Sequence, residues 1–396
     1  MKVLFLSWAY PKESSPYLGI WAHQQALALR NGGVDVEVVN SVPFIPRAAG
    51  FLSGKIKKYS EIPSVEKLDG VTVYHPKFIR VSPNSALDEF LFRLMGIQTK
   101  LLARRLRRQI DVGRYQVLHA HNIFPDGAIA YRLHRKYGIP YVLTLHDVDR
   151  FHSYPKEGPH RELGSAILSH ASKVLAVSNR VKSNIREHVP NGRSVELLYN
   201  TFWTQDHLSD TGSGKRKRIV TLASLIKRKG VHELLRAFRE VLGRYPDYEL
   251  MMIGQGSELG PLKKAAEELG VAGSVTFTGA MPHADAMKEL ARSSIFCLAS
   301  WDEAFGVAYA EAMSYGLPVI GCRGEGIADV VTDGVDGLLV EPRNAEELAR
   351  ALFRLIEHPE EAERIGSNGR ERIRELRPEA FGRKLAGIYE EILLTV

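Results

Sequence analysis

Two glutamates, Glu303 and Glu311, stand at the ends of the segment EAFGVAYAE, with Gly306 between them. A carboxylate can accept hydrogen bonds from two adjacent hydroxyls, which suits a sugar or a ribose. A glycine at the start of a helix lets backbone amides approach a phosphate, and the helix dipole also favours negative charge there. The segment therefore predicts two hydroxyl-binding carboxylates on either side of a phosphate site. The same spacing also arises from an acid at a helix start and a solvated glutamate.

Two further segments of the second half carry glycines after an apolar run, and the first of them also carries cations. Lys229 and Gly230 in LASLIKRKG lie between an apolar run and a helical pattern, where Lys229 could bind a diphosphate. Gly254 and Gly256 in IGQGSELGPL follow another apolar run. The next glycine, Gly260, comes too late for the dinucleotide fingerprint G-x-G-x-x-G. This loop is expected to border a ligand, although ordinary turn glycines explain it almost equally well.

The first half carries histidines and acids after two apolar runs. HAHNIFPDGAIA contains His119, His121 and Asp126, and TLHDVDR contains His146. Side chains that follow parallel strands lie at the carboxyl edge of the sheet, where ligands bind. His146 is therefore the strongest ligand-binding candidate, His121 with Asp126 forms a second candidate, and His119 is expected to turn into the core. Gly19, in SPYLGIWAHQQALAL, either lets the backbone approach a ligand or only marks a helix start.

Short apolar runs alternate with helical patterns along the whole chain. The runs are VLFLSWA, VDVEVV, VTVYHP, YQVLHAH, YVLTLH, KVLAVS and VELLY, followed by RIVTLAS, YELMMIG, SVTFTG, SIFCLAS, LPVIG and GLLVEP. Continuous apolar strands that alternate with helices indicate parallel sheets covered on both faces. A chain of 396 residues is too long for one ordinary core, so the pattern predicts two Rossmann-like α/β domains facing each other across a cleft.

The composition is that of a globular protein, with 44% hydrophobic and 25% charged residues. No run of eighteen apolar residues predicts a membrane-spanning helix, and MKVLFLSWAYP is expected to be a first strand rather than a signal peptide. The two cysteines, Cys297 and Cys322, lie in apolar surroundings typical of free buried thiols in a reducing compartment. A cytoplasmic location follows as an expectation.

The formal net charge of +7 is unevenly distributed. Residues 1–205 hold 28 lysines and arginines against 16 acids, so the remainder of the chain is mildly acidic. FLSGKIKKY and FLFRLMGIQTKLLARRLRRQI mix apolar residues with Lys55, Lys57, Lys58, Arg104, Arg105, Arg107 and Arg108. Such a mixture is typical of a peripheral membrane surface, and equally of a solvated helix face. Nucleic acid is not expected, because no recognised nucleic-acid module accompanies the charge.

The longest motifs resemble those of glycosyltransferase family 4, retaining enzymes of the GT-B fold. EAFGVAYAEAMSYGLPVIG resembles the family's nucleotide-sugar motif, and GEGIADVVTDGVDGLLVEP its return to a strand. LASLIKRKGVHELLRAF, MMIGQGSELGPLKKAAEELGV and VTFTGAMPHADAMKELARSSIFCLAS fit the same pattern, and so do four segments of the first half. The segment around Gly19 resembles the members linked to cell-surface polysaccharide synthesis.

The resemblance also implies a domain arrangement. Residues 1–204 with about 378–396 would form an acceptor-binding domain, because the last helix of GT-B proteins usually crosses back to the first domain. Residues 205–377 would bind the nucleotide-sugar. The boundary is expected in YNTFWTQDHLSDTGSGKRKR, a polar stretch typical of a linker.

Site roles follow from the same resemblance. The donor-binding residues would be Gly19, Gly254, Gly256, Glu303, Phe305, Gly306, Val307 and Glu311, and the catalytic residues His146, Glu303 and Lys229. Within this set Glu303 would bind the donor sugar, Glu311 the ribose and Lys229 the diphosphate. The family's arginine five residues before the lysine is Ser224 here, and Arg228 is a candidate substitute. Arg323, Gly324 and Gly326 in CRGEGI are expected near the same ligand.

The implied function is retaining transfer of a hexose from a UDP- or GDP-sugar to a glycan or lipid-linked acceptor, with His121 and Asp126 at the acceptor. No metal or other cofactor is expected, although Asp147-x-Asp149 superficially matches the D-x-D metal motif of the other major glycosyltransferase fold. An anionic surface at the inner face of the cell membrane is a candidate partner. The alternatives are a non-catalytic nucleotide-sugar-binding scaffold and a Rossmann-type oxidoreductase.

Overall fold

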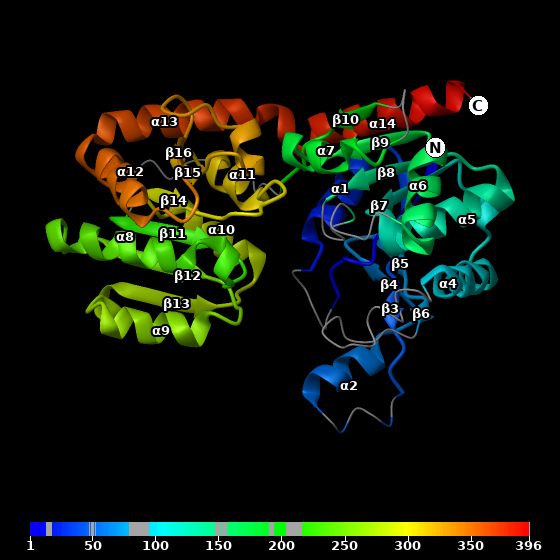
Figure 1. The fold of residues 1–396 in the computed structure, drawn as a ribbon, viewed down its shortest axis with the longest axis horizontal. Helices are drawn as coiled ribbons and strands as arrows, with labels where there is room; N and C mark the ends of the chain where they lie inside the picture. Colours follow the sequence, from blue (N-terminus) through cyan, green and yellow to red (C-terminus); the bar gives the residue numbers. More distant parts are fainter. Residues whose placement is uncertain are drawn as a thin grey trace. The chain divides into compact units, whose positions relative to one another are not determined.

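The computed structural model describes residues 1–12, 18–46, 48, 51, 53–78, 95–146, 151, 157–189, 194–202 and 216–395. The chain divides into two compact units (Figure 1). The first unit comprises Met1–Thr201 together with Pro378–Val396, and the second comprises Phe202–Arg377. The linker predicted around residues 199–218 falls where the first unit ends and the second begins, and residues 203–215 lie outside the described part of the chain.

The first unit is built on an eight-stranded sheet in the order β10-β9-β8-β7-β1-β2-β5-β4. Its strands are β1 (Lys2–Leu6), β2 (Asp35–Val39), β4 (Val65–Leu68), β5 (Val71–Tyr74), β7 (Val117–His121), β8 (Tyr141–Leu145), β9 (Lys173–Ala176) and β10 (Val195–Leu197). All neighbours pair in parallel except β4 with β5. Every residue of β7 and β8 is buried, as their apolar sequences predict.

Sequence patterning missed three short strands of this unit. β4 lies at the edge of the large sheet and exposes every other residue, so its segment VEKL carries no continuous apolar run. β3 (Val42–Pro43) and β6 (Lys77–Phe78) form a separate two-stranded sheet of two residues each. Strands this short bury too few side chains to leave a periodic signal.

Helices lie against the large sheet of the first unit, except for one, α2, which lies apart from it (Figure 1). They are α1 (Ile20–Asn31), α2 (Gly54–Glu61), α4 (Met95–Gln109), α5 (Ala128–Tyr137), α6 (Pro159–His170), α7 (Asn179–Arg186) and α14 (Pro378–Leu394). The C-terminal helix α14 packs against α1, as predicted for the last helix. Gly382 allows the close approach, because a Cβ atom there would lie 2.5 Å from the carbonyl oxygen of Ala28.

The second unit has a six-stranded, fully parallel sheet in the order β13-β12-β11-β14-β15-β16. Its strands are β11 (Arg218–Leu222), β12 (Glu249–Ile253), β13 (Val275–Gly279), β14 (Ile295–Cys297), β15 (Val319–Cys322) and β16 (Leu338–Val340). Its helices are α8 (Val231–Arg244), α9 (Leu259–Glu268), α10 (His283–Ala291), α11 (Val307–Ser314), α12 (Ala345–Glu357) and α13 (Pro359–Arg372). The two doubly wound parallel sheets confirm the predicted fold class.

Each unit has its own hydrophobic core. In the second unit, apolar residues of α8 and α12 pack on β11, β12 and β15, and both predicted free cysteines are buried. In the first unit the core joins β1, β2 and α1 to the apolar face of α14, which contributes Phe381, Leu385, Ile388, Tyr389 and Ile392. Among the described residues no helix is long and apolar enough to cross a membrane.

We expect Tyr389→Phe to destabilise the protein by about 1–3 kcal/mol, because it leaves a buried histidine nitrogen without its partner. The Tyr389 hydroxyl lies 2.5 Å from Nδ1 of His119, and both residues are fully buried. Urea-induced unfolding measures the effect. The matched control is Tyr131→Phe, which removes a hydroxyl that is only partly buried. Equal stability of the two variants would contradict a structural role for the α14 contact.

Candidate functional site

The candidate residues of the second unit gather where the strand order reverses. Going outward from β11, the chain order runs to β12 and β13 on one side and to β14, β15 and β16 on the other. Loops that leave the carboxyl ends of two strands at such a point diverge and leave room for a ligand. The loop after β11 carries Lys229, and the loop after β14 carries Glu303.

These two loops are joined by an ion pair. The ammonium group of Lys229 contacts Oε2 of Glu303, and the side chains are only 13% and 11% exposed. The hydroxyl of Ser300 donates a second hydrogen bond to the same Glu303 oxygen at 3.0 Å. Two residues predicted for one ligand are therefore in direct contact.

Glu303 is ionised despite its burial. Burial by itself raises the pKa of this carboxyl, but the charge and hydrogen bond of Lys229 outweigh it, and the pKa is lowered. The charge of Arg228 and the Ser300 hydroxyl act in the same direction. The backbone N–H of Glu303 donates to Oε2 of Glu325 at 2.7 Å, which fixes the loop. A held carboxylate of this kind suits recognition of neutral hydroxyls.

Two helices begin beside this ion pair, each at a glycine with left-handed backbone. Gly230 (φ 64°) precedes α8 and Gly306 (φ 78°) precedes α11, and neither helix start has a side-chain cap. A Cβ atom on Gly230 would lie 2.0 Å from the carbonyl oxygen of Ala299, so α8 starts in contact with the end of β14. Uncapped amides at helix starts attract anions. Val307 is the first residue of α11, and the side chain of Phe305 is buried.

Glu311 lies on α11 and is held by a residue that sequence reasoning missed. Nε2 of His283, at the start of α10, lies 2.7 Å from Oε1 of the buried Glu311. Burial lowers the pKa of His283, but the hydrogen bond and charge of Glu311 outweigh it, so the pKa is raised. The signal available in the sequence was the position of His283 just after the apolar run SVTFTG, on the same strand edge as the other candidates.

The glycines of the second unit allow loops to pack closely. A Cβ atom on Gly254 would lie 1.8 Å from the carbonyl oxygen of Ala223, and one on Gly256 would lie 2.1 Å from that of Leu225. These glycines bring the loop after β12 against the loop after β11. The sequence left open that Gly254 and Gly256 are ordinary turn glycines, and these close contacts support that interpretation. Their role in donor binding stays a prediction.

Two arginines, Arg228 and Arg323, were expected near the same ligand as Lys229, and both have contacts with the protein itself. Nη1 of Arg228 donates to the carbonyl oxygen of Asp302 at 2.8 Å. Arg323 forms ion pairs with Asp333, Glu341 and Glu347, the nearest at 2.5 Å. Three carboxylates therefore hold the guanidinium of Arg323, and the expectation that Arg323 lies near the ligand stays a prediction.

The structure also shows the surroundings of Ser224, Gly324 and Gly326. Ser224, which replaces the family's arginine, is exposed. Gly326 allows the loop after β15 to contact the EAFG segment, since a Cβ atom there would lie 2.1 Å from the carbonyl oxygen of Ala304. Nothing crowds a Cβ atom on Gly324, whose φ is 73°.

In the first unit the candidate histidines form an aromatic cluster at the ends of β7 and β8. Nδ1 of His121 lies 3.1 Å from Nε2 of His146, and the indole ring of Trp21 stacks on His146 with 3.6 Å between ring centroids. Trp21 lies in the first turn of α1, and Gly19 is the N-cap of this helix. Gly19 has φ 73°, and a Cβ atom there would lie 1.9 Å from the carbonyl oxygen of Ala9. The tight turn at Gly19 thus positions the stacking tryptophan.

These histidines are neutral. Burial lowers the pKa of His121 to about 3 and, together with the nearby His121 ring, lowers that of His146 well below its ordinary value. Nε2 of His146 is engaged with Nδ1 of His121. Nε2 of His121 is buried and has no hydrogen-bond partner among the described residues. Such a nitrogen can bind a ligand hydroxyl or a water.

Two remaining candidates of the first unit, Asp126 and His119, make hydrogen bonds within the unit itself. Oδ2 of Asp126 accepts a hydrogen bond from the backbone N–H of Trp8 at 3.1 Å. His119 turns into the core as predicted, bonded to Thr144 and Tyr389. Asp147 and Asp149 lie outside the described residues. Within the described ranges, no group of three or more His, Cys, Asp or Glu side chains is arranged to hold a metal ion.

Comparison with protein families matches both units. The family described as glycosyl transferases group 1 matches residues 205–372, and the family described as Glycosyltransferase Family 4 matches residues 18–202. The chain belongs to glycosyltransferase family 4. The order of the two matches follows the two units, so the family covers both strand edges described above.

Curated relatives match this glycosyltransferase over nearly its whole length or over part of it. It is 28% identical to the putative teichuronic acid biosynthesis glycosyltransferase TuaC of Bacillus subtilis over 365 residues, 89% of each chain. A mannosyltransferase of Mycolicibacterium smegmatis, described as GDP-mannose-dependent and acting on phosphatidylinositol monomannoside, is 34% identical over 166 residues, 40% of this chain and 44% of the relative. The resemblance predicted from the motifs is confirmed.

Solved structures of similar fold are glycosyltransferases as well. Sucrose-phosphate synthase from Thermosynechococcus elongatus superposes with a TM-score of 0.77 at 20% identity, covering 100% of both chains. HepE from Anabaena, solved with UDP and glucose, superposes with a TM-score of 0.71 at 18% identity, covering 99% of this chain and 100% of that one. At these identities the likeness establishes the GT-B fold.

We expect Lys229→Met to destabilise the protein by roughly 3 kcal/mol near neutral pH, because it leaves the buried Glu303 carboxylate without its cation. The folded-state pKa of Glu303 is below its ordinary 4.5, so its contribution to stability is present above pH 4.5 and is lost as the pH falls through the folded value. The gap between wild type and variant should therefore shrink in acid. Unfolding curves at several pH values measure it, with exposed Lys227→Met as control. A gap that is independent of pH would contradict the pairing.

We expect His283→Gln to cost about 1 kcal/mol of stability at mildly acidic pH through loss of the charged hydrogen bond to Glu311. The pKa of His283 is raised above its ordinary 6.5, so the contribution is full below pH 6.5 and is lost as the pH rises through the folded value. Thermal unfolding of both proteins across this range tests the sign. The control is His170→Gln, which removes an exposed histidine. A difference that grows with pH would refute the assignment.

Proposed function

We propose that this glycosyltransferase moves a hexose from a UDP- or GDP-sugar to a hydroxyl of a glycan or lipid-linked acceptor, with retention at the anomeric carbon, in cell-surface polysaccharide biosynthesis. The observation that carries the proposal is the Lys229–Glu303 pair beside the uncapped starts of α8 and α11. It places a cation, free amides and a carboxylate together at the strand edge, which matches a sugar diphosphate. HepE, whose fold is shared, was solved with UDP-glucose, and TuaC is named for teichuronic acid biosynthesis.

Each part of the donor has a proposed partner. The diphosphate would bind the first-turn amides of α8 and α11, including the segment Phe305–Val307, and the ammonium group of Lys229. Glu303 would accept hydrogen bonds from the sugar hydroxyls. Glu311, fixed by His283, would accept the two ribose hydroxyls, since a carboxylate has two oxygens for two neighbouring donors. The Lys229–Glu303 contact would then be shared with the ligand rather than broken.

The chemistry depends on the leaving group. The bond between the anomeric carbon and the diphosphate oxygen breaks, negative charge grows on the diphosphate, and helix amides with Lys229 stabilise that charge. The acceptor oxygen forms the new bond on the same face, and its proton passes to the departing diphosphate. No side chain needs to act as a strong base. His146 is neutral, so it would contribute a hydrogen bond to the sugar rather than a charge.

The proposal also covers the residues near the acceptor, the need for a metal and the location of the enzyme. His121 and Asp126 are proposed to lie near the acceptor, because Nε2 of His121 has no partner among the described residues. Charge neutralisation by Lys229 and two helix starts would make a divalent metal unnecessary. The acceptor would be presented at the inner face of the cell membrane, with the enzyme in the cytoplasm.

A non-catalytic, nucleotide-sugar-binding scaffold is the second candidate. The exposed Ser224 stands where the resemblance implies an arginine, and Arg228 is bonded to the Asp302 carbonyl. A weaker cationic clamp would favour binding over turnover. Membership of a glycosyltransferase family leaves the oxidoreductase alternative without support.

The test is thermal unfolding against a panel of nucleoside diphosphates and their sugars, followed by transfer assays with the donor it identifies. A ligand at a hundred times its dissociation constant stabilises the native state by about 2.7 kcal/mol. We expect one nucleotide series to raise the midpoint. Glu311→Gln should weaken binding of the free diphosphate, whereas Glu303→Gln should mainly weaken binding of the sugar nucleotide and abolish transfer. Glu240→Gln, an exposed acid on α8, is the matched control.

The outcomes separate the candidates. No midpoint shift with any nucleotide would reject the donor site. Binding without transfer or donor hydrolysis in the wild type would favour the scaffold. Full turnover in Glu303→Gln would remove that residue from the site.

A further inference from the structure

An arginine and a tryptophan form a stack at the strand edge of the second unit. The guanidinium carbon of Arg343 lies 4.8 Å from the ring centroid of Trp301. Trp301 belongs to the loop after β14, shortly before Glu303, and Arg343 belongs to the loop after β16. Arg343 is exposed and Trp301 is partly exposed. The stack therefore presents a cation and an aromatic surface to solvent on the edge that carries the candidate donor residues.

Two backbone contacts hold the loop that carries Trp301. The backbone N–H of Trp301 donates to the carbonyl oxygen of Arg228 at 2.8 Å. In the reverse direction, Nη1 of Arg228 donates to the carbonyl oxygen of Asp302 at 2.8 Å. The indole is thus fixed relative to the loop that carries Lys229. An aromatic ring held in this way can form a binding surface without losing much conformational entropy.

Arg343 occupies a turn position that favours glycine. Its φ is 63°, in the left-handed region. The residue before it is Pro342, and the backbone N–H of Asn344 donates to the carbonyl oxygen of Glu341 at 3.3 Å across the turn. Proline followed by a residue with positive φ is the pattern of a type II turn, in which the second of the two is normally glycine. An arginine carries backbone strain there that glycine would not, so the turn alone does not explain this side chain.

Among the residues that the structure describes, no acid forms an ion pair with Arg343. Two acids that flank it in the chain, Glu341 and Glu347, pair with Arg323 instead, at 3.5 and 2.5 Å. A guanidinium stays charged at physiological pH and can offer two parallel N–H donors to a carboxylate or a phosphate. Stacking on an indole leaves the N–H groups at the edge of the guanidinium available for such a ligand.

We propose that Trp301 and Arg343 form a subsite for an acidic sugar residue of the acceptor glycan. The apolar face of the pyranose ring would pack against the indole, and the carboxylate or phosphate of that sugar would accept two hydrogen bonds from the guanidinium. The anionic group belongs to the acceptor and not to the donor sugar. The buried Glu303 is ionised, so it would repel a second negative charge on the sugar that it binds.

The inference rests on the proposed transfer reaction and adds the chemical class of its acceptor. The subsite shares no residue with Lys229, Glu303 and Glu311, so nucleotide binding can succeed or fail independently of it. A subsite that binds part of the acceptor away from the reacting hydroxyl contributes to affinity and takes no part in bond formation. Its loss should therefore raise KM and leave kcat unchanged.

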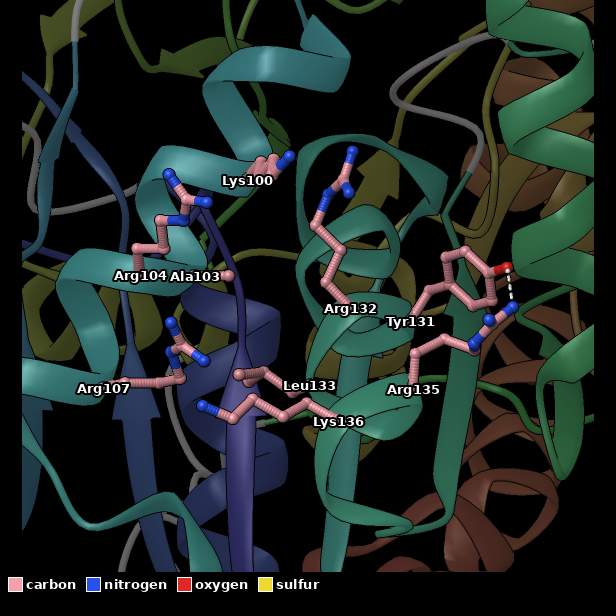
Figure 2. A pocket seen from close by; sticks show the side chains of 9 residues that line it. All are labelled: Lys100, Ala103, Arg104, Arg107, Tyr131, Arg132, Leu133, Arg135 and Lys136. Carbon is pink, nitrogen blue, oxygen red and sulfur yellow. Dashed lines mark hydrogen bonds between the residues drawn. The ribbon is translucent and has the colours of Figure 1, made fainter.

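A second group of cations has to be distinguished from this stack. A groove of about 450 Å³ lies between α4 and α5 of the first unit, and its lining includes Lys100, Arg104, Arg107 and Lys136 (Figure 2). Figure 2 shows the side chain of Lys136 extending from α5 towards Arg107 of α4. Clustered cations attract any polyanion, so an acidic glycan could bind there through charge alone. The experiment therefore changes both places.

The experiment is calorimetric titration of the full chain with a glucuronate-containing tetrasaccharide and with the same tetrasaccharide after its carboxylates are reduced to alcohols. A tetrasaccharide that carries a 6-phosphate is the third probe. We expect an acidic probe to bind about tenfold more tightly than the reduced one, because a charge-assisted hydrogen bond contributes about that factor. The stronger of the two acidic probes identifies the anion as carboxylate or phosphate. Equal binding of all three probes would overturn the subsite.

Arg343→Gln should weaken binding of the acidic tetrasaccharide about tenfold and leave binding of the reduced one unchanged. Arg343→Gly should have the same effect on binding and should keep or raise the unfolding midpoint, since glycine relieves the left-handed strain. Trp301→Leu should weaken binding of both tetrasaccharides, because packing against the ring does not depend on charge. The matched control is Arg350→Gln, which removes an exposed charge from α12. Arg104→Gln with Arg107→Gln is the control for the groove.

The readouts separate the subsite from the other candidates. In transfer assays with an acidic acceptor, Arg343→Gln should raise KM about tenfold and leave kcat and the nucleotide-induced midpoint shift unchanged. Equal weakening by Arg343→Gln and Arg350→Gln would overturn the subsite, because net charge alone would then explain binding. Loss of binding only in the groove variant would overturn it as well. Binding of the acidic probe that depends on Arg343, without any nucleotide-induced shift, would support the subsite and reject the proposed donor site.

Discussion

The ion pair between Lys229 and Glu303 is the interaction on which the rest of the candidate donor site depends. It joins loops from β11 and β14, the two strands between which the strand order reverses. Because both side chains are almost buried, neither charge is tolerable without the other. The pair therefore holds the starts of α8 and α11 close together, and their amides become available at one place.

The strand edges of the two units differ in their electrostatics. The second unit presents an ionised carboxylate, an ammonium group and helix starts, all suited to a charged diphosphate. The first unit presents two histidines, His121 and His146, beside the indole ring of Trp21. Both imidazole rings are neutral, because burial lowers their pKa values. Neutral rings can direct a hydroxyl without competing for the donor's charge.

Glycines determine how closely the loops of the second unit pack. At Gly230, Gly254, Gly256 and Gly326 a Cβ atom would lie within about 2 Å of a carbonyl oxygen, which no backbone could accommodate without moving. From the sequence alone, these motif glycines would be assigned to ligand contact. The structure shows that the loops also need them in order to pack against one another. The two roles are compatible, since the same close packing positions the amides.

The sequence by itself determined the fold class, the thirteen apolar strands and the strand-end placement of the candidate residues, because continuous apolar runs and turn residues are local signals. It also indicated the return of α14, through the resemblance rather than through any local pattern. Only the tertiary structure decided which side chains meet. Lys229 pairs with Glu303 across 74 residues, and His283 pairs with Glu311 across 28. It also showed that Arg323 is held by acids and that α4 and α5 enclose a groove. Such contacts depend on which strands and helices become neighbours, and periodicity carries no information about that choice.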